Sequence, residues 1–353
     1  MSTIISLSIR NTYSCVKYLH CSFFSSKIEH AVSKTSGKVV NVAVIGAPNS
    51  GKSTLINRII ERKICAASNK VHTTTKLARA ICYENDTQII FLDTPGVVTY
   101  KEQKKYKLPE AMVGACHKSL RCADVVGVVH DVSSRWTKDS IHTDVINILN
   151  MVRDIPSFLI LNKVDKLKSK RQLLSIIRNV TNGVIAGKPL PNSEGDSARN
   201  KLVRGYSYFS DVFLVSALTG DGVNAIKEYL ISNAKVARLH YTPDQWTDQT
   251  PETLIEDAVR AKFLDFLAQE IPYNLKIYLE YYDELQEEGK VICSVGVECP
   301  SERIARLISG AGGGRLQQIK SYVRSDLMDV FKKSVVIDIQ LKVKNKPLEM
   351  EIN

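Results

Sequence analysis

The segment from residue 38 to residue 60 constrains the fold more than any other part of this sequence. Residues 38–45 read KVVNVAVI, a β-branched apolar run that is typical of a buried parallel strand. They lead into GAPNSGKST at residues 46–54 and then into LINRII, an apolar stretch with helical spacing. Strand, G-x-x-x-x-G-K-S loop and helix in this order indicate a P-loop, in which backbone N–H groups surround phosphate oxygens at a helix N-terminus.

Different residues of this loop are expected to contact the phosphates and the Mg²⁺ ion. We expect Lys52 to reach the β- and γ-phosphates, which makes it a candidate catalytic residue, and the Ser53 hydroxyl to bind Mg²⁺. The predicted nucleotide-binding residues of the loop are Gly46, Ala47, Pro48, Asn49, Ser50, Gly51, Lys52, Ser53 and Thr54.

Two later motifs decide which base binds. Residues 157–165 read SFLILNKVD, a buried strand that ends in NKVD, and residues 211–222 form another strand followed by Ser-Ala-Leu. Asp165 can accept hydrogen bonds from N1–H and the exocyclic amine of guanine, whereas adenine would leave this carboxylate unpaired. Asn162 braces the loop and the Lys163 stem covers the ring. The predicted base-binding residues are Asn162, Lys163, Val164, Asp165, Ser216, Ala217 and Leu218.

A fourth motif, DTPG, ends the apolar strand 87–93 and belongs to the phosphate side of the site. We expect Asp93 to reach Mg²⁺ through water and the Gly96 N–H to contact the γ-phosphate, so Gly96 is a second candidate catalytic residue. Val97 follows where signalling GTPases carry a Gln that orients the attacking water, so we expect slow intrinsic hydrolysis. The predicted nucleotide-binding residues here are Asp93, Thr94, Pro95, Gly96 and Val97.

Residues 68–81, SNKVHTTTKLARAI, are rich in threonine and lie between the P-loop and DTPG. A switch loop in this position senses Mg²⁺ and the γ-phosphate through a threonine hydroxyl. Thr73 and Thr74 are both candidates and the sequence does not choose between them; we place Thr74 in the metal-binding and catalytic sets. The P-loop also contains the G-x-P-N sequence, in which Asn49 is a candidate ligand for a K⁺ ion.

The N-terminal leader differs from the rest of the chain. Its first 28 residues contain no Asp or Glu, whereas Arg10, Lys17 and Lys27 are basic and serine is abundant. This composition is typical of an organellar transit peptide, so we predict such a leader over residues 1–37, with a disordered tail as the alternative. The whole chain has 48 Lys and Arg against 37 Asp and Glu, a net charge of +11 that favours polyanionic partners. We expect no transmembrane segment, because no apolar stretch of about 18 residues occurs.

The domain organisation follows from the remaining patterns. We predict an α/β P-loop GTPase domain over residues 38–238, with a mostly parallel sheet and helices on both faces. Residues 167–208 include the unpatterned stretch GKPLPNSEGDSARN, so we interpret them as an insertion before the last strands. Residues 239–252 carry two prolines and little periodicity, which indicates an inter-domain linker.

Residues 253–353 predict a second, smaller α+β domain in the order α-β-β-α-α-β. A G-x-x-G turn between two helices in this order matches a type II KH domain, whose loop lets a nucleic-acid backbone approach closely. A glycine-rich turn in an unrelated domain is the alternative. Residues 303–346 hold 10 basic and three acidic residues, although residues 245–353 as a whole are acidic. The predicted RNA-binding residues are Gly310, Ala311, Gly312, Gly313, Arg315 and Lys320.

Together the G-x-P-N-x-G-K-S-T loop, the V-H-T-T switch, DTPG, NKVD, SAL and the KH order resemble the Era GTPases over residues 39–344. The leader and the V-H-T-T wording are most similar to the mitochondrial Era-like proteins of animals. The resemblance implies a GTPase that uses GTP, GDP and Mg²⁺, binds small-subunit rRNA and assists assembly of the small ribosomal subunit in the mitochondrial matrix. Two features depart from the family: Ala311 stands where many members have a basic residue, and the 167–208 stretch is longer than in the bacterial proteins.

Other function classes stay open. A GTPase of tRNA modification or signalling would use the C-terminal domain on tRNA or on a protein, and a GTP-switched RNA chaperone would hydrolyse GTP only incidentally. We expect a monomer, because no interface signal is evident. Peripheral association with the inner membrane through the basic faces also stays open.

Overall fold

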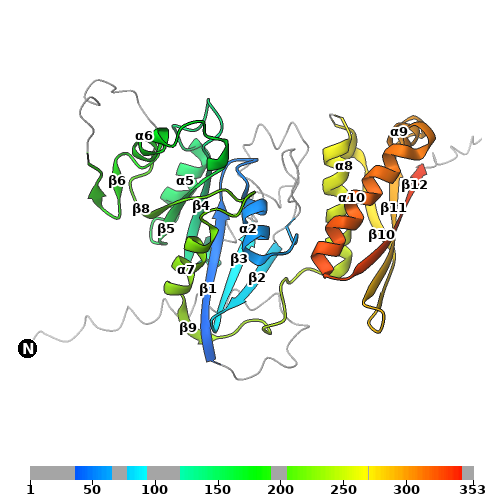
Figure 1. Cartoon of the computed structure of the whole chain (residues 1–353), viewed down its shortest axis with the longest axis horizontal. Coiled ribbons are helices and arrows are strands. Elements are labelled where there is room, and N and C mark those ends of the chain that lie inside the picture. The colour runs from blue at the N-terminus through cyan, green and yellow to red at the C-terminus, as the bar shows by residue number, and fades with distance from the viewer. Residues whose placement is uncertain (1–35, 66–77, 94–119, 192–204, 269, 344–353) are drawn as a thin grey trace, which may run out of the picture.

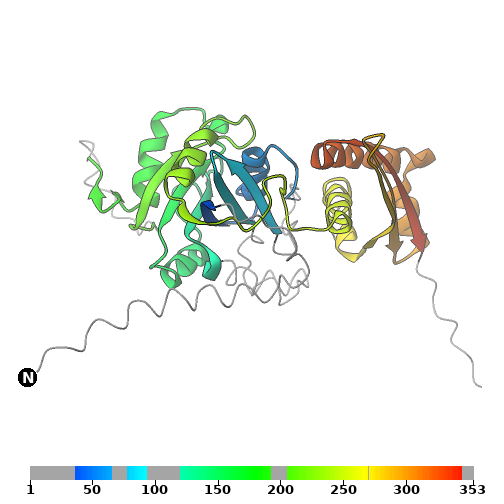
Figure 2. The same ribbon diagram turned by 90° about the horizontal axis from the view of Figure 1, so that it is seen from below.

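The computed structural model describes residues 36–65, 78–93, 120–191, 205–268 and 270–343. Within these ranges the chain forms two units, which lie next to each other in Figure 1 and in the perpendicular view of Figure 2. The first is built on a seven-stranded sheet and the second on a three-stranded sheet. The fold class predicted from the sequence is confirmed.

The large sheet is mostly parallel, with strand order β2-β3-β1-β4-β5-β8. Strand β2 runs antiparallel to β3, and the short strand β9 pairs antiparallel with the start of β1. Because β1, β3, β4 and β5 run in the same direction, their carboxyl ends meet at one edge, where ligands of such sheets bind. The strands are β1 (Ser36–Ile45), β2 (Ala78–Glu84), β3 (Thr87–Asp93), β4 (Val125–Asp131), β5 (Ser157–Asn162), β8 (Phe209–Leu214) and β9 (Lys235–Arg238).

Helices cover both faces of this sheet, as predicted. On one face, α2 (Lys52–Ile60) and α7 (Val223–Ser232) pack on the inward side chains of β1, such as Val42. On the other face, α5 (Thr143–Met151) and α6 (Arg171–Val180) pack on the alternate side chains, such as Ala43. Alternating side chains of β1 are therefore buried on both faces, which explains why its sequence is almost continuously apolar.

The interpretation of residues 167–208 as an insertion is wrong for residues 171–180, which form a helix of the GTPase domain. Helix α6 contributes Ile176 and Val180 to the core of the sheet. A helix is required here because the parallel strands β5 and β8 need a crossover connection. What remains outside the core is a small hairpin of β6 (Val184–Ile185) and β7 (Lys188–Pro189), while residues 192–204 lie outside the described part.

The segment before the second unit is attached to the sheet. The side chain of Gln88 accepts hydrogen bonds from the backbone N–H groups of His240 at 2.9 Å and Tyr241 at 3.1 Å. Further along, the Thr247 hydroxyl donates to the Arg79 carbonyl at 2.9 Å. The region predicted to be a linker is therefore fixed along β2 and β3 up to Thr250, which caps the next helix.

The second unit follows the order α-β-β-α-α-β that the sequence predicts. Its strands form the sheet β10-β11-β12, antiparallel between β10 and β11 and parallel between β11 and β12. Its helices pack on one face of that sheet around Val259, Val295 and Val323. The elements are α8 (Pro251–Phe266), β10 (Lys276–Leu285), β11 (Lys290–Cys299), α9 (Glu302–Ser309), α10 (Gly314–Phe331) and β12 (Ser334–Val343). Short 3₁₀ helices are η2 (Val164–Lys166), η4 (Ile271–Asn274) and η5 (Ala311–Gly313).

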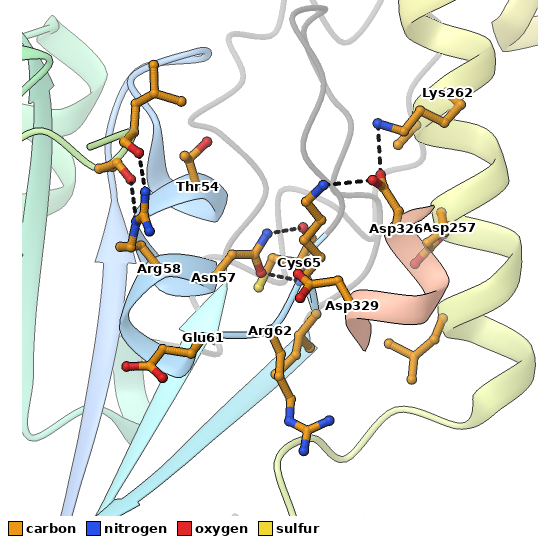
Figure 3. A pocket seen from close by; sticks show the side chains of 17 residues that line it. Thr54, Asn57, Arg58, Glu61, Arg62, Cys65, Asp257, Lys262, Asp326 and Asp329 are labelled. Carbon is orange, nitrogen blue, oxygen red and sulfur yellow. Dashed lines mark hydrogen bonds and ion pairs between the residues drawn. The ribbon is translucent and has the colours of Figure 1, made fainter. Parts of the chain in front are cut away.

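The second unit docks on the helix that follows the P-loop (Figure 3). Asp326 of α10 accepts from Lys63 at 2.7 Å and from Lys262 of α8 at 2.8 Å. Arg62 donates to the Val330 carbonyl at 2.9 Å, and Val330 joins the core beneath α2. A cavity of about 510 Å³ lies between α2 and the helices α8 and α10. Among the described residues no helix has the length and apolar character needed to span a bilayer.

Candidate functional site

The P-loop follows β1 at the carboxyl edge of the large sheet and leads directly into α2. Lys52, the first residue of α2, is buried, with 7% of its surface exposed. Its Nζ donates to the carbonyl oxygens of Gly46 at 3.2 Å and Ala47 at 3.1 Å. The ammonium group is therefore folded back under the loop, where arriving phosphate oxygens can take over its hydrogen bonds.

The end of the loop requires glycine and leaves one hydroxyl available. Gly51 has φ +99°, and a Cβ at this position would lie 2.2 Å from Nδ2 of Asn162, so a side chain cannot be accommodated. The neighbouring Ser50 is buried, yet its Oγ has no hydrogen-bond partner within the described part of the chain. A buried, unpaired hydroxyl is unfavourable unless a ligand satisfies it, so the loop fits a phosphate group.

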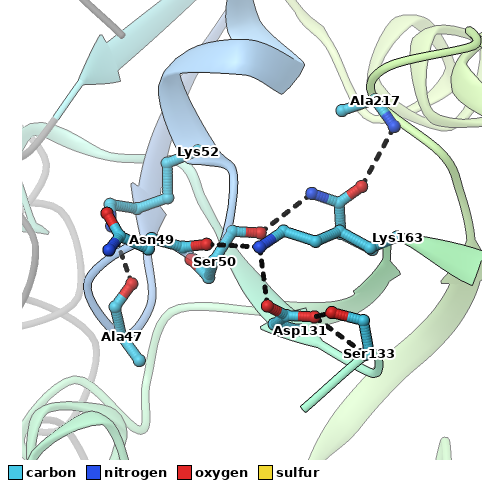
Figure 4. A network of polar contacts seen from close by, with 9 residues as sticks. Ala47, Asn49, Ser50, Lys52, Asp131, Ser133, Lys163 and Ala217 are labelled. Carbon is cyan, nitrogen blue, oxygen red and sulfur yellow. Dashed lines mark hydrogen bonds and ion pairs between the residues drawn. The ribbon is translucent and has the colours of Figure 1, made fainter. Parts of the chain in front are cut away.

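Asn162 joins three of the predicted motifs, and Figure 4 shows Ser50, Lys163 and Ala217 of these motifs close together. This side chain is 1% exposed. Its Nδ2 donates to the Ser50 carbonyl at 2.8 Å, and its Oδ1 accepts from the Ala217 N–H at 3.0 Å. One amide thus connects the P-loop, the NKVD strand and the SAL loop, which are far apart in the sequence.

Lys163 lies where the sequence predicts the base to bind, and it contacts a residue that the sequence analysis missed. It has φ +67°, and its Nζ lies 2.6 Å from Oδ2 of Asp131 and 2.7 Å from the Asn49 carbonyl. Asp131 also accepts from the backbone N–H and hydroxyl of Ser133. Burial alone would raise the pKa of the Asp131 carboxyl, but the hydrogen bonds from Lys163 and Ser133 hold it below its ordinary value. The signal available in the sequence was an acidic residue at the end of an apolar strand.

Arg58 of α2 holds the SAL loop in place and was also missed. Its Nε donates to the Ala217 carbonyl at 3.3 Å, and its Nη2 donates to the Leu218 carbonyl. Beyond these contacts the Leu218 side chain points outward, and Asp165 in η2 is exposed. The edge next to Asn162 and Lys163 therefore presents an open carboxylate, as base recognition requires.

The expected metal ligands lie at the same edge as far as the structure describes them. Asp93 ends β3 and pairs with Val44 of β1, so its backbone is adjacent to the start of the P-loop, and Ser53 is in the first turn of α2. No group of three or more His, Cys, Asp or Glu side chains converges anywhere in the described ranges. Thr73, Thr74, Thr94, Pro95, Gly96 and Val97 lie outside the described residues.

The predicted RNA-binding loop connects α9 and α10. Gly313 has φ +76°, a conformation that a side chain strains, and a Cβ at Gly312 would meet open space. Arg315 does not point freely outward, because its guanidinium donates to the Leu307 carbonyl at 2.9 Å and so braces the two helices across the loop. Lys320 forms an ion pair with Asp338 of β12 at 2.9 Å.

A groove continues from this loop along α10. It has a volume of about 330 Å³ and lies between α10 and the edge strand β12. Two basic side chains, Lys320 and Arg324, line it next to apolar Val336 and Ile337. Basic groups beside an apolar floor suit a nucleic-acid strand, whose phosphates and bases need different partners.

Comparisons with known proteins cover almost the whole chain. The family model described as "50S ribosome-binding GTPase" matches residues 41–163. The protein "GTPase Era, mitochondrial" of Salmo salar is 34% identical over 354 residues, covering 88% of this chain and 77% of the relative. "GTPase Era" of Rickettsia bellii (strain OSU 85-389) is 31% identical over 315 residues, covering 89% of this chain and 95% of the relative.

Two solved structures share the fold of both units. The crystal structure of Era in complex with MgGDPNP and nucleotides 1506–1542 of 16S ribosomal RNA superposes with a TM-score of 0.70 at 23% identity. Aquifex aeolicus Era bound to GDP and AlF₄⁻ gives the same TM-score at 24% identity. Each match covers 88% of this chain and 95% of the solved chain.

Proposed function

The chain belongs to the Era family of GTPases, and on this premise we propose that it binds and hydrolyses GTP at the P-loop edge and binds small-subunit rRNA through its KH domain. The observation that carries the proposal is Asn162, which holds the P-loop, NKVD and SAL motifs in one hydrogen-bonded site. In this function the protein assists assembly of the small ribosomal subunit.

The phosphate side of the proposed site is supplied by the P-loop. Lys52 exchanges its loop carbonyls for the β- and γ-phosphates, and the N-terminus of α2 adds a favourable dipole. The Ser50 hydroxyl, which lacks a partner among the described residues, is available for a phosphate or ribose oxygen. Ser53 and Asp93 would hold Mg²⁺, which when bound neutralises charge between the β- and γ-phosphates.

The base side discriminates guanine from adenine. The exposed Asp165 carboxylate accepts from N1–H and the amine of guanine, while the Lys163 stem covers the ring face. The contacts of Lys163 with Asp131 and Asn49 hold this lysine extended before the base arrives. A preset side chain loses little conformational entropy on binding, which favours affinity.

Hydrolysis is proposed to be slow without a stimulating partner. Val97 cannot orient water, which leaves Lys52, Thr74 and the Gly96 N–H to stabilise the transferred phosphoryl group. Asn49 is the residue through which K⁺ would add positive charge at the phosphates. A GTPase with slow intrinsic hydrolysis acts as a switch, whose conformation depends on whether GTP or GDP is bound.

The RNA function rests on the G-x-x-G loop and the groove between α10 and β12. The open space at Gly312 admits a phosphate, and Lys320 and Arg324 follow the strand along α10. The choice of small-subunit rRNA is supported by the Era crystal structure, which holds a segment of 16S rRNA. The names of the Salmo salar and Danio rerio relatives and the acid-free leader support the mitochondrion, and we propose a monomer in the matrix.

Crosslinking of tagged protein to RNA in cells, followed by sequencing of the bound fragments, tests this function. We expect reads on the mitochondrial small-subunit rRNA and their loss in Gly313→Asp, because an acidic side chain there both strains the loop and repels phosphate. Lys52→Ala should keep RNA contact but block release of the protein from the assembling subunit. Reads on tRNA would favour the tRNA-directed alternative, and normal assembly in Lys52→Ala cells would favour the chaperone alternative.

A further inference from the structure

The loop after β4 exposes a tryptophan almost completely. Trp136 is 95% exposed, whereas large aromatic side chains are normally buried for most of their surface. The other tryptophan, Trp246, packs against the main core cluster. Trp136 follows the exposed Arg135 in a turn that begins at the sheet edge where the nucleotide motifs meet.

This loop is fixed against α6 by contacts near both ends of the helix. The Lys138 Nζ donates to Oε1 of Gln172 at 3.0 Å, and Asp139 accepts from Asn179 at 3.4 Å. The His130 ring donates from Nε2 to the Lys138 carbonyl at 2.9 Å. Trp136 therefore stands in an anchored turn, and Lys138, two residues further on, is held beside Gln172, the residue that follows Arg171.

The neighbouring surface is strongly basic. Residues 133–140 and 163–172 together contain seven Lys and Arg residues and two Asp residues. No ion pair within the described part of the chain involves the exposed cations of this surface. We define the Trp136 patch as Arg135, Trp136, Lys168, Lys170 and Arg171.

We propose that the Trp136 patch binds single-stranded RNA, as a second RNA contact beside the KH domain, and this inference rests on the proposed function. Unpaired cations attract successive phosphates, and a rigid exposed indole offers a flat face on which a base stacks. Stacking needs no particular base, so the patch adds affinity and orientation rather than sequence specificity.

The composition of the patch favours RNA over a membrane or a protein. A helix that inserts in a lipid interface must present an apolar face, but Leu173, Ile176 and Val180 of α6 are buried in the core. Protein interfaces are depleted in lysine at their centres, whereas this patch combines two lysines and two arginines with one aromatic group. A phosphodiester chain satisfies both the cations and the ring.

The distance of the Trp136 patch from the KH domain sets a minimum length for an RNA that contacts both. Helix α6 and the KH domain lie at opposite ends of the molecule in both views (Figures 1 and 2). The patch also lies at the nucleotide edge, on the β4–β5 side of the P-loop, while the KH domain docks on α2. An RNA that contacts both surfaces must pass along the GTPase domain.

The test is binding of a fluorescent, U-rich single-stranded RNA of roughly a dozen nucleotides to the full chain, measured by anisotropy over a KCl series. We expect Trp136→Ala to weaken binding about fivefold or more, and Trp136→Phe to keep most of the affinity, because phenylalanine still stacks. The combined change Lys168→Glu, Lys170→Glu and Arg171→Glu should reduce the slope of log Kd against log salt by about two.

The matched control is Lys38→Glu, Arg121→Glu and Lys188→Glu, which reverses the charge of three exposed basic residues of the GTPase domain outside the patch. All variants should keep wild-type GTP turnover, which shows that they fold. Equal binding by the patch variant and this control would overturn the inference. So would a patch variant that binds RNA normally and loses only its binding to phosphatidylserine vesicles. Wild-type RNA binding by Gly313→Asp would instead contradict the KH part of the proposed function and leave the patch standing.

Discussion

The ammonium nitrogen of Lys163 lies 2.6 Å from the carboxylate of Asp131, at the end of the neighbouring strand β4. The same nitrogen donates to the P-loop through the Asn49 carbonyl. The lysine assigned to the base is therefore held on two sides, and the strand end, the NKVD motif and the P-loop form one unit. Side chains fixed by such supporting contacts bind ligands with less reorganisation.

Asp131→Ala removes one side of this support and should weaken nucleotide binding. Lys163 would then keep only the Asn49 carbonyl, and the Ser133 groups would lose their acceptor. We expect dissociation of a fluorescent GDP analogue to accelerate about tenfold, because hydrogen bonds to charged groups contribute about 1.5–3 kcal/mol. Asp131→Asn should show a smaller effect, and Asp144→Ala on α5 serves as the control. An unchanged dissociation rate for Asp131→Ala would mean that Lys163 is positioned without Asp131.

Asn162→Ala should destabilise the GTPase domain as well as impair nucleotide binding. It leaves the buried Ser50 carbonyl and the Ala217 N–H without their partner. Each unsatisfied buried group is unfavourable by about 1–3 kcal/mol, so we expect a clearly lower unfolding midpoint in urea. Asn150→Ala, at an exposed position of α5, is the control. Wild-type stability of Asn162→Ala would contradict the role of this side chain as the junction of the three motifs.

Lys63→Met and Lys262→Met separate docking of the KH domain from its internal stability. Both lysines bind Asp326, but Lys63 comes from the GTPase domain and Lys262 from α8 of the KH domain itself. We expect Lys63→Met to increase the radius of gyration in small-angle scattering with little change in melting temperature. Lys262→Met should lower the melting temperature of the KH domain instead. Identical behaviour of the two variants would show that Asp326 does not connect the domains.

His130 predicts a loss of stability on mild acidification. Burial lowers the pKa of this histidine below its ordinary value of about 6.5, so the folded state binds its proton less readily than the unfolded chain. Its contribution is therefore complete above about pH 6.5 and falls as the pH drops toward the folded pKa. His130→Gln should flatten the urea-unfolding stability between about pH 7 and pH 5 relative to wild type. Parallel pH profiles for the two proteins would contradict this assignment.

The parts of the site that the sequence predicts are those in which one short segment carries the whole signal. The P-loop combines its strand, its glycines and Lys52 within a few residues, and the α-β-β-α-α-β order of the KH domain follows from hydrophobic period and turn residues. Asp131 and Arg58 were not predicted, because their roles depend on contacts with Lys163 and Leu218, which are distant in the chain. Such contacts exist only once the sheet has assembled.

The fold differs from the sequence-based predictions at two places, and the two differences have different causes. The interpretation of residues 167–208 rests on the unpatterned stretch after residue 186, although Leu173, Ile176 and Val180 have helical spacing. Two neighbouring parallel strands need a crossover connection, usually a helix, and this rule predicts a helix between β5 and β8. Strand β9 was missed because it is a short, mostly exposed strand that pairs with β1 only after the chain has returned to the sheet.

The central claim is that Asn162, Lys163 and Asp165 select guanine for the P-loop, and the most direct test is the affinity of the Asp165→Asn variant for GTP, XTP and ATP. Xanthine presents an acceptor where guanine has its amine, so an amide at position 165 restores the pairing that the carboxylate makes with guanine. We predict that the wild-type protein prefers GTP over ATP and XTP, and that Asp165→Asn prefers XTP. Unchanged GTP affinity in this variant, or wild-type binding of ATP equal to that of GTP, would contradict the account.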